Sequence, residues 1–113
     1  MTGRNPLLAT PPYAVARELA RLGESLRTAR VRRNLTIKEV SEKIGTGPRA
    51  IMDAERGKAS TGAGIYLALL WAYDLLSQLS PVASPAQDEQ GLRLAASREK
   101  TRARKSIGLD NDF

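Results

Sequence analysis

The stretch that decides the fold is Leu35–Lys58, LTIKEVSEKIGTGPRAIMDAERGK. Thr36 and Glu39 have the spacing of a capping box, in which each residue satisfies a backbone N–H of the other. A helix is therefore predicted from Thr36 to about Ile44, with Val40 and Ile44 buried on one face. Gly45 can adopt a positive φ without strain, so we expect it to end this helix in a sharp turn.

A second short helix is predicted directly after this turn. Thr46 is the expected N-cap, and Pro48 lies in the first turn, where a missing N–H does no harm. The helix is expected to end near Glu55. Two short helices joined through a glycine indicate a helix-turn-helix.

Residues 13–33 are predicted to form the helix that precedes this pair. Their apolar positions step by four and three along one helical face. Gly23 falls inside this pattern and costs about 1 kcal/mol relative to alanine, so we expect a break or bend there, between a leader helix and a first core helix. The apolar positions are Val15, Leu19, Leu22, Leu26 and Ala29.

The chain is most apolar at Ile65–Leu76, where Asp74 is the only polar residue. This stretch is shorter than the ~20 residues that span a bilayer, so it is predicted to be a core helix, with Thr61 as a possible cap. A helix that is apolar on every side must be covered on more than one face, which predicts a homodimer. The residues assigned to core or dimer contacts are Ile65, Leu69, Trp71, Tyr73 and Leu76.

Three regions are therefore expected. Residues 1–12 contain three prolines and are predicted to be a flexible arm, and residues 13–80 form the compact helical domain. Residues 81–113 form an extension, with a short helix capped by Ser84 and ending near Ser97, a basic stretch and the acidic-aromatic end Asp110–Phe113. Residues 92–105 hold six basic side chains against Glu99 alone, a local net charge of 6 − 1 = +5.

Composition narrows the possible functions. With 18 Lys and Arg against 12 Asp and Glu, the net charge of +6 favours a polyanionic partner such as nucleic acid. Histidine and cysteine are absent, which excludes thiol nucleophiles, histidine acid-base catalysis and metal sites built on these residues. We therefore expect no enzyme, no cofactor and no metal. The N-terminal stretch has too short an apolar run for a secretory signal, so a cytoplasmic protein is expected, with no membrane partner.

The order of residues in Leu35–Lys58 resembles the lambda-repressor and Cro-like (XRE) family, and the resemblance extends over about Leu22–Leu79. It rests on the capped helix, the turn glycine and the ending Glu55-x-Gly57-Lys58. The resemblance implies an all-α fold, a compact four- to five-helix domain that binds double-stranded DNA with two half-sites. The alternative is a basic helical bundle that binds only protein.

The resemblance also implies roles for single residues. Arg49, Asp53 and Pro48 occupy positions from which members of the family touch base edges. Arg49 is the expected guanine reader, with a phosphate contact as its alternative. Asp53 could accept from cytosine or could orient Arg49, and Pro48 offers only apolar contact. Phosphate contacts are expected from Thr36, Thr46, Gly47, Arg56, Gly57 and Lys58, and a structural ion pair from Arg30 and Glu55.

Two functions follow from the resemblance. A small XRE repressor with such an extension is similar to the antitoxins of Hip-type toxin-antitoxin pairs, which repress their own operon and neutralise a HipA-like kinase toxin. The alternative is a stand-alone repressor without a protein toxin partner. On the simpler interpretation of the extension, Arg98–Lys105 adds non-specific affinity for DNA phosphates, and the extension binds no protein partner.

Overall fold

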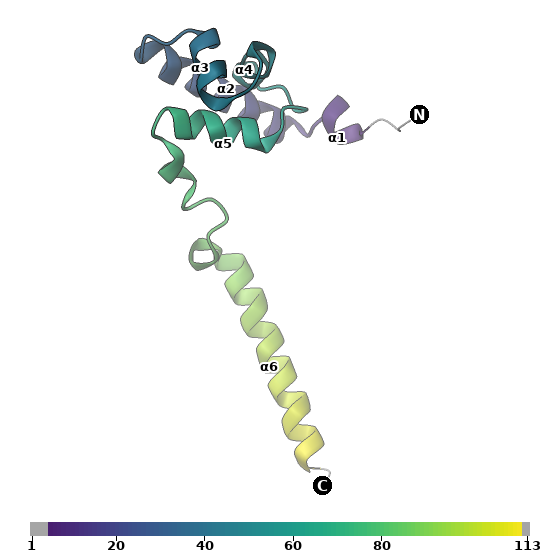
Figure 1. Cartoon of the computed structure of the whole chain (residues 1–113). Helices are drawn as coiled ribbons and strands as arrows, with labels where there is room; N and C mark the ends of the chain where they lie inside the picture. The colour runs from purple at the N-terminus through teal and green to yellow at the C-terminus, as the bar shows by residue number, and fades with distance from the viewer. Residues whose placement is uncertain (1–4, 112–113) are drawn as a thin grey trace. The chain divides into compact units, whose positions relative to one another are not determined.

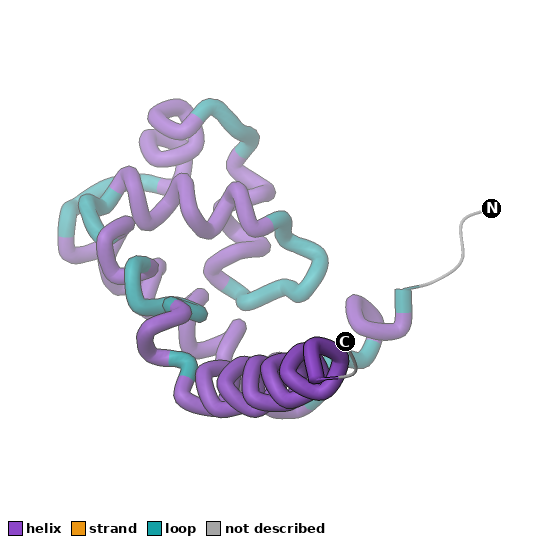
Figure 2. The backbone as a smooth tube through the Cα atoms, turned by 90° about the horizontal axis from the view of Figure 1, so that it is seen from below, coloured by secondary structure: helices purple, strands orange, loops and turns teal. Residues whose placement is uncertain are grey.

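The computed structural model describes the backbone of residues 5–111 and the side chains of residues 5–105. It divides into two compact units, Met1–Ser77 and Gln78–Phe113, which we describe separately. All regular structure within the described range is helical, which confirms the predicted all-α fold (Figure 2). The elements are α1 (Pro6–Ala9), α2 (Tyr13–Arg32), α3 (Ile37–Ile44), α4 (Pro48–Glu55), α5 (Ala63–Ala72), the 3₁₀ turns η1 (Leu76–Leu79) and η2 (Pro85–Gln87), and α6 (Glu89–Asn111).

The core of the first unit lies between α2, α3, α4 and α5, which pack together as a compact group (Figure 1). Each helix contributes at least one side chain that is almost completely buried. Because these helices bury only one stripe each, the opposite faces of α3 and α4 remain at the surface. The most completely buried large side chains are Leu26, Val40, Ile51, Leu69 and Tyr73.

The capping box and the glycine turn form as predicted. The Thr36 hydroxyl accepts from the Glu39 amide, and the Glu39 carboxylate accepts from the Thr36 amide, both at 3.0 Å. Gly45 adopts the left-handed conformation with φ of 79° and ends α3. Near the end of α3, the Lys43 ammonium donates to the Ala72 carbonyl of α5 at 3.3 Å.

Two other predicted caps are wrong. Gly47, not Thr46, is the N-cap of α4, because Pro48 holds the first helical position and the residue before a proline is extended. Gly62, not Thr61, precedes α5. Thr61 belongs instead to the turn after α4, where its amide donates to the Lys58 carbonyl at 3.0 Å.

The predicted break at Gly23 is also wrong, since α2 is one continuous helix from Tyr13 to Arg32. Gly23 is buried against the end of α4, and a Cβ atom there would lie 2.6 Å from the carbonyl oxygens of both Ala54 and Glu55. The missing side chain therefore lets two backbones approach each other. Gly57 makes the reciprocal contact, because a Cβ on it would lie 2.5 Å from the Leu19 carbonyl oxygen.

The ends of the first unit also differ from expectation. The N-terminal arm includes the one-turn helix α1, because Asn5 caps it by accepting from the Leu7 amide at 3.0 Å. The apolar helix stops at Ala72 instead of Leu76, since Asp74 turns the chain with a positive φ of 59°.

In the second unit the predicted short helix starts later and continues much further. Ser84 makes no side-chain cap bond, and it is Asp88 that accepts from the Gly91 amide at 2.9 Å. The helix α6 continues past Ser97 because residues 92–105 contain neither glycine nor proline and are rich in Leu, Ala, Arg and Lys, which favour helix. The side chains of the acidic-aromatic end lie outside the described residues. No helix in the described part of the chain combines the length and apolar character that crossing a membrane requires.

Candidate nucleic-acid interface

The helix-turn-helix holds α4 by its inner face and leaves its outer face in solvent. Ile51 and Ala54 are completely buried on the inner face. Pro48 and Arg49 lie on the outer face, and 76% of the Arg49 side chain is exposed. An arginine that is exposed on a rigidly anchored helix can reach a base edge without disturbing the core.

Asp53 lies between two cations instead of pointing freely outward. Its Oδ1 is 3.6 Å from Arg49 Nε, and its Oδ2 is 3.8 Å from Lys58 Nζ. Its backbone carbonyl accepts from the Lys58 amide at 3.0 Å. Only 18% of the Asp53 side chain is exposed, so the carboxylate is more buried than either of the two cations beside it.

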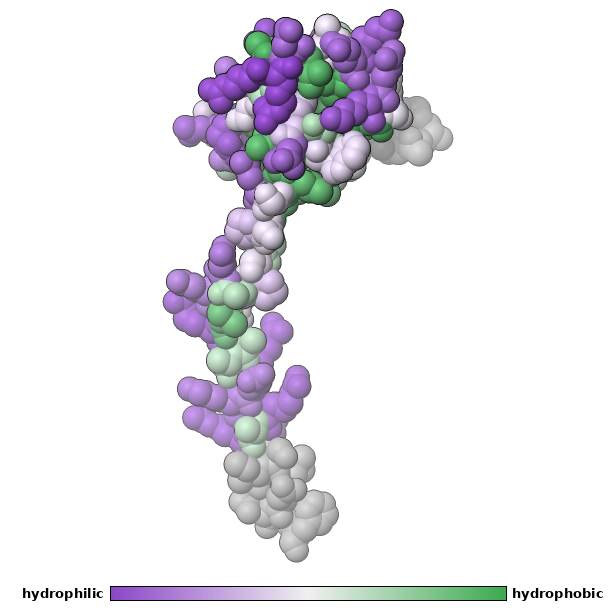
Figure 3. All heavy atoms as spheres, turned by 60° about the vertical axis from the view of Figure 1, so that its left-hand side comes forward, coloured by the Kyte–Doolittle hydropathy of each residue, from purple (hydrophilic) through white to green (hydrophobic). Residues whose placement is uncertain are grey.

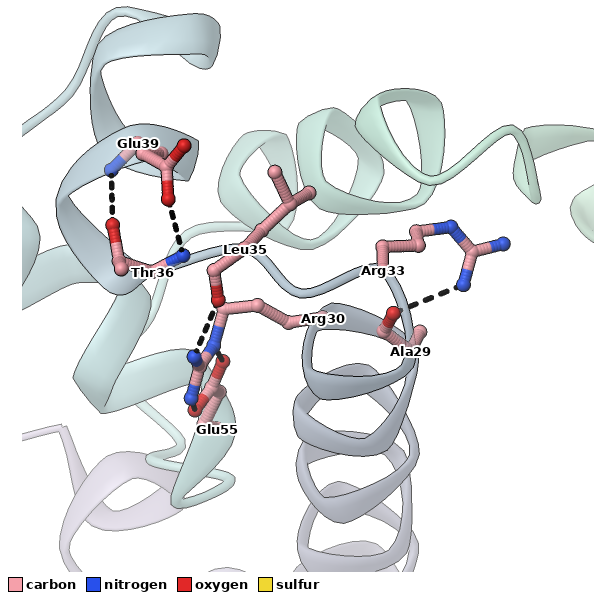
Figure 4. A network of polar contacts seen from close by, with 7 residues as sticks. All are labelled: Ala29, Arg30, Arg33, Leu35, Thr36, Glu39 and Glu55. Carbon is pink, nitrogen blue, oxygen red and sulfur yellow. Dashed lines mark hydrogen bonds and ion pairs between the residues drawn. The ribbon is translucent and has the colours of Figure 1, made fainter.

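Arg30 and Glu55 lie against each other, as shown in Figure 4. Arg30 donates to Glu55 through Nε at 2.7 Å and through Nη2 at 3.1 Å, and its Nη1 donates to the Leu35 carbonyl. The side chains are only 12% and 8% exposed. The hydrogen bond to Glu55 raises the pKa of Arg30 above its ordinary value. This pair ties α2 to the end of α4 and to the segment that leads into α3.

The backbone donors expected to hold phosphates are largely engaged within the protein. The Thr36 amide donates to Glu39, whose pKa is lowered by hydrogen bonds from Thr36. The Gly57 amide donates to the Ala54 carbonyl at 3.0 Å, and the Thr46 amide donates to the Ser41 carbonyl at 2.9 Å. The side chains of Arg56 and Lys58 are exposed. Side chains, more than these amides, are therefore the donors that this surface offers.

A further basic side chain that the sequence reasoning missed joins the same surface. Arg27 lines a shallow depression together with Ile37, Met52 and Arg56, above the Arg30–Glu55 pair. Its place could have been found from the sequence, because a residue three positions before Arg30 lies on the same side of α2. The depression thus brings Arg27 of α2 and Arg56, which directly follows α4, beside the apolar side chains of Ile37 and Met52.

The residues assigned to core or dimer contacts divide into two groups. Leu69 and Tyr73 are buried in the first unit, and Ile65 is half-buried. Burial raises the pKa of Tyr73 to about 12, and Arg33 packs over its ring at 5.6 Å from the centroid. Trp71 and Leu76 are 56% and 40% exposed.

Comparison with protein families matches residues 26–74 to the family described as Helix-turn-helix. The matched segment covers α3, α4 and α5 together with the last turns of α2, which is under half of the chain. This family suggests a DNA-binding transcription regulator and is not usually enzymatic. No curated protein and no solved structure is similar enough to the chain to count as a match.

Proposed function

Starting from a helix-turn-helix segment at residues 26–74, we propose that this chain is a sequence-specific transcriptional repressor that places α4 in the DNA major groove. The observation that carries the proposal is the outer face of α4, where an exposed Arg49 lies 3.6 Å from the carboxylate of Asp53. The planar guanidinium fits the O6 and N7 atoms of guanine. Asp53 is a positioning residue in this proposal, and Pro48 contributes apolar contact to the neighbouring base.

The proposal also includes phosphate contacts around Arg49. Arg56 and Lys58 follow α4, and Arg27 lines the same depression as Arg56. The Thr36 and Thr46 hydroxyls and the backbone at Gly47 complete the proposed set. Gly57, which the sequence also predicts to bind phosphate, is not included, because its amide donates to Ala54 and its Cα packs against Leu19. Such contacts fix the register of the protein on DNA without reading sequence.

The proposed base contact of Arg49 and the proposed phosphate contact of Lys58 predict different responses to mutation. Arg49→Ala is expected to reduce discrimination at one base pair by about 1 to 3 kcal/mol. Lys58→Ala is expected to weaken all sequences alike and to lower the slope of log K against log salt by about 0.9. The measurement is a set of binding isotherms on duplexes that are selected by the wild-type chain and then varied base by base. If both variants lose affinity uniformly over all bases, Arg49 is not the base reader.

The repressor is proposed to act as a homodimer on two half-sites. Leu67 and Trp71 are one helical turn apart on α5 and are 45% and 56% exposed, and Leu76 adds a third exposed apolar side chain. A second copy of this chain would cover such a surface with its own equivalent side chains, which a two-fold axis allows. DNA sites with two half-sites require this symmetry.

Trp71→Glu is expected to convert the dimer to a monomer, because a carboxylate cannot be buried there without a partner. Sedimentation velocity measures the change. Since Trp71 is the only tryptophan in the chain, its emission should also shift to longer wavelength on dilution of the wild type. Val31→Glu is the matched control, since Val31 is a similarly exposed apolar residue (53%) on α2. A wild-type chain that stays monomeric at micromolar concentration, or an equal loss in the control, would contradict the assignment.

A second candidate function adds a protein partner. The second unit, Gln78–Phe113, lies entirely outside the matched segment, which favours an additional role such as the Hip-type antitoxin function. The chain would then repress its own operon and neutralise a HipA-like kinase toxin. A chain that ends at Pro81 should still select the same operator but should lose a kinase-like protein that co-purifies with the full chain in equal amount. Retention of that protein by the shortened chain would move its interface to the first unit.

A further inference from the structure

The helix α6 carries its cations in two rows. With about 100° between successive residues, positions i, i+7 and i+11 share one flank of a helix, and positions i, i+4 and i+7 share another. All six basic side chains are exposed. The first basic row is Arg93, Lys100 and Arg104, and the second basic row is Arg98, Arg102 and Lys105.

The two rows are separated by two faces that carry no basic side chain. Leu92, Ala95, Ala96 and Ala103 lie between the rows on one side, interrupted by Glu99, and Leu94, Ser97 and Thr101 lie between them on the other. Figure 3 shows hydrophilic side chains projecting from both sides of this helix with more apolar ones between them. The charge is thus arranged along two flanks instead of being spread evenly over one face.

The same arrangement places like charges close together. Arg98 and Arg102 are four residues apart, and so are Lys100 and Arg104, and like charges at this spacing destabilise a helix. No ion pair within 4.0 Å involves a side chain of α6 among residues 89–105. A polyanion that approached both flanks would remove this repulsion.

We propose that α6 is a second DNA-binding element, which lies in a groove of double-stranded DNA with one basic row against each phosphate strand. A helix with side chains is about 10 to 12 Å across, and the major groove is about 12 Å wide, so both flanks of the helix face phosphates at once. The first row extends for about 16 Å along the axis of α6, and each DNA strand presents one phosphate per ~3.4 Å of the DNA axis, so the row is long enough to meet more than one phosphate. The inference rests on the proposed function for its choice of DNA as the polyanion.

The test uses the full chain and a labelled mixed-sequence duplex, with affinity measured by anisotropy over a series of salt concentrations. Replacing the first row by glutamine, and separately the second row, should each lower the slope of log K against log salt by about 2 to 3, and both together by about 5. A variant with lysine at Arg93, Arg98, Arg102 and Arg104 keeps every charge and should keep the slope. A single strand of equal length should bind with a smaller slope.

The outcomes separate this inference from the proposed function. If only one of the two row variants loses affinity for the duplex, α6 does not straddle two strands. If neither variant loses affinity, the second unit is left to a protein partner. Either result overturns the inference. The variant Arg56→Gln with Lys58→Gln, measured in parallel, reports on the helix-turn-helix. If this variant binds as the wild type does while the row variants lose affinity, α6 binds DNA and the proposed use of α4 fails.

Discussion

Arg30→Ala is expected to lower the free energy of unfolding by about 3 to 5 kcal/mol, because it leaves the Glu55 carboxylate buried without its partner. The loss includes the bond from Arg30 to the Leu35 carbonyl, which holds the segment before α3. The loss of unfolding free energy is measured by urea denaturation monitored by circular dichroism. In a first unit of this size the loss approaches the whole stability of a small domain.

The chain offers a matched control for this variant. Arg21 and Glu18 form an ion pair at 2.6 Å on α2, but both side chains are 66% exposed. Arg21→Ala should therefore cost no more than about 1 kcal/mol. The double variant Arg30→Met with Glu55→Leu should recover much of the loss, since it strands no charge. Equal costs for Arg30→Ala and Arg21→Ala would show that burial does not set the strength of the Arg30–Glu55 pair.

Gly23→Ala should destabilise the protein by about 3 kcal/mol, although alanine is the better helix former by about 1 kcal/mol. The added Cβ would lie 2.6 Å from two backbone carbonyl oxygens, and backbone cannot move aside as a flexible side chain can. The helices α2 and α4 would have to separate. Thermal and urea unfolding of the variant measure the effect.

Gly64→Ala provides the opposite expectation in a helix of the same unit. A Cβ at Gly64 would meet nothing within 4 Å, so only propensity acts and the variant should be more stable by up to about 1 kcal/mol. The two substitutions are chemically identical and differ only in what surrounds the new methyl group. A stabilising Gly23→Ala would mean that the contact between α2 and α4 is looser than described.

These glycines illustrate which parts of the fold can be predicted from sequence. The box at Thr36 and Glu39 and the turn at Gly45 depend on residues close together in the chain, so spacing alone predicts them. The local pattern around Gly23 predicts a helix break, but the structural reason for this glycine lies on another helix. Its missing side chain allows close contact with Ala54 and Glu55, and this contact outweighs the poor helix propensity of glycine. A local pattern has no access to such a contact.

The candidate interface likewise has features that local sequence predicts and features that depend on residues further along the chain. The exposure of Arg49 follows from its place opposite Ile51 and Ala54 on a short helix. The position of Asp53 between two cations does not follow, because Lys58 returns to it only through the turn after α4. Arg27 was missed since it comes from a third helix that the helix-turn-helix pattern does not include.

The short connections between α2, α3, α4 and α5 also have a consequence for the order of folding. Helices that follow one another closely in the chain form their contacts with little loss of loop entropy, and helical domains of this kind fold in microseconds to milliseconds. A ribosome adds about 5 to 20 residues per second, so the second unit takes seconds to synthesise. The first unit therefore folds faster than the ribosome adds a single residue, so its fold is complete as soon as its last helix has left the ribosome.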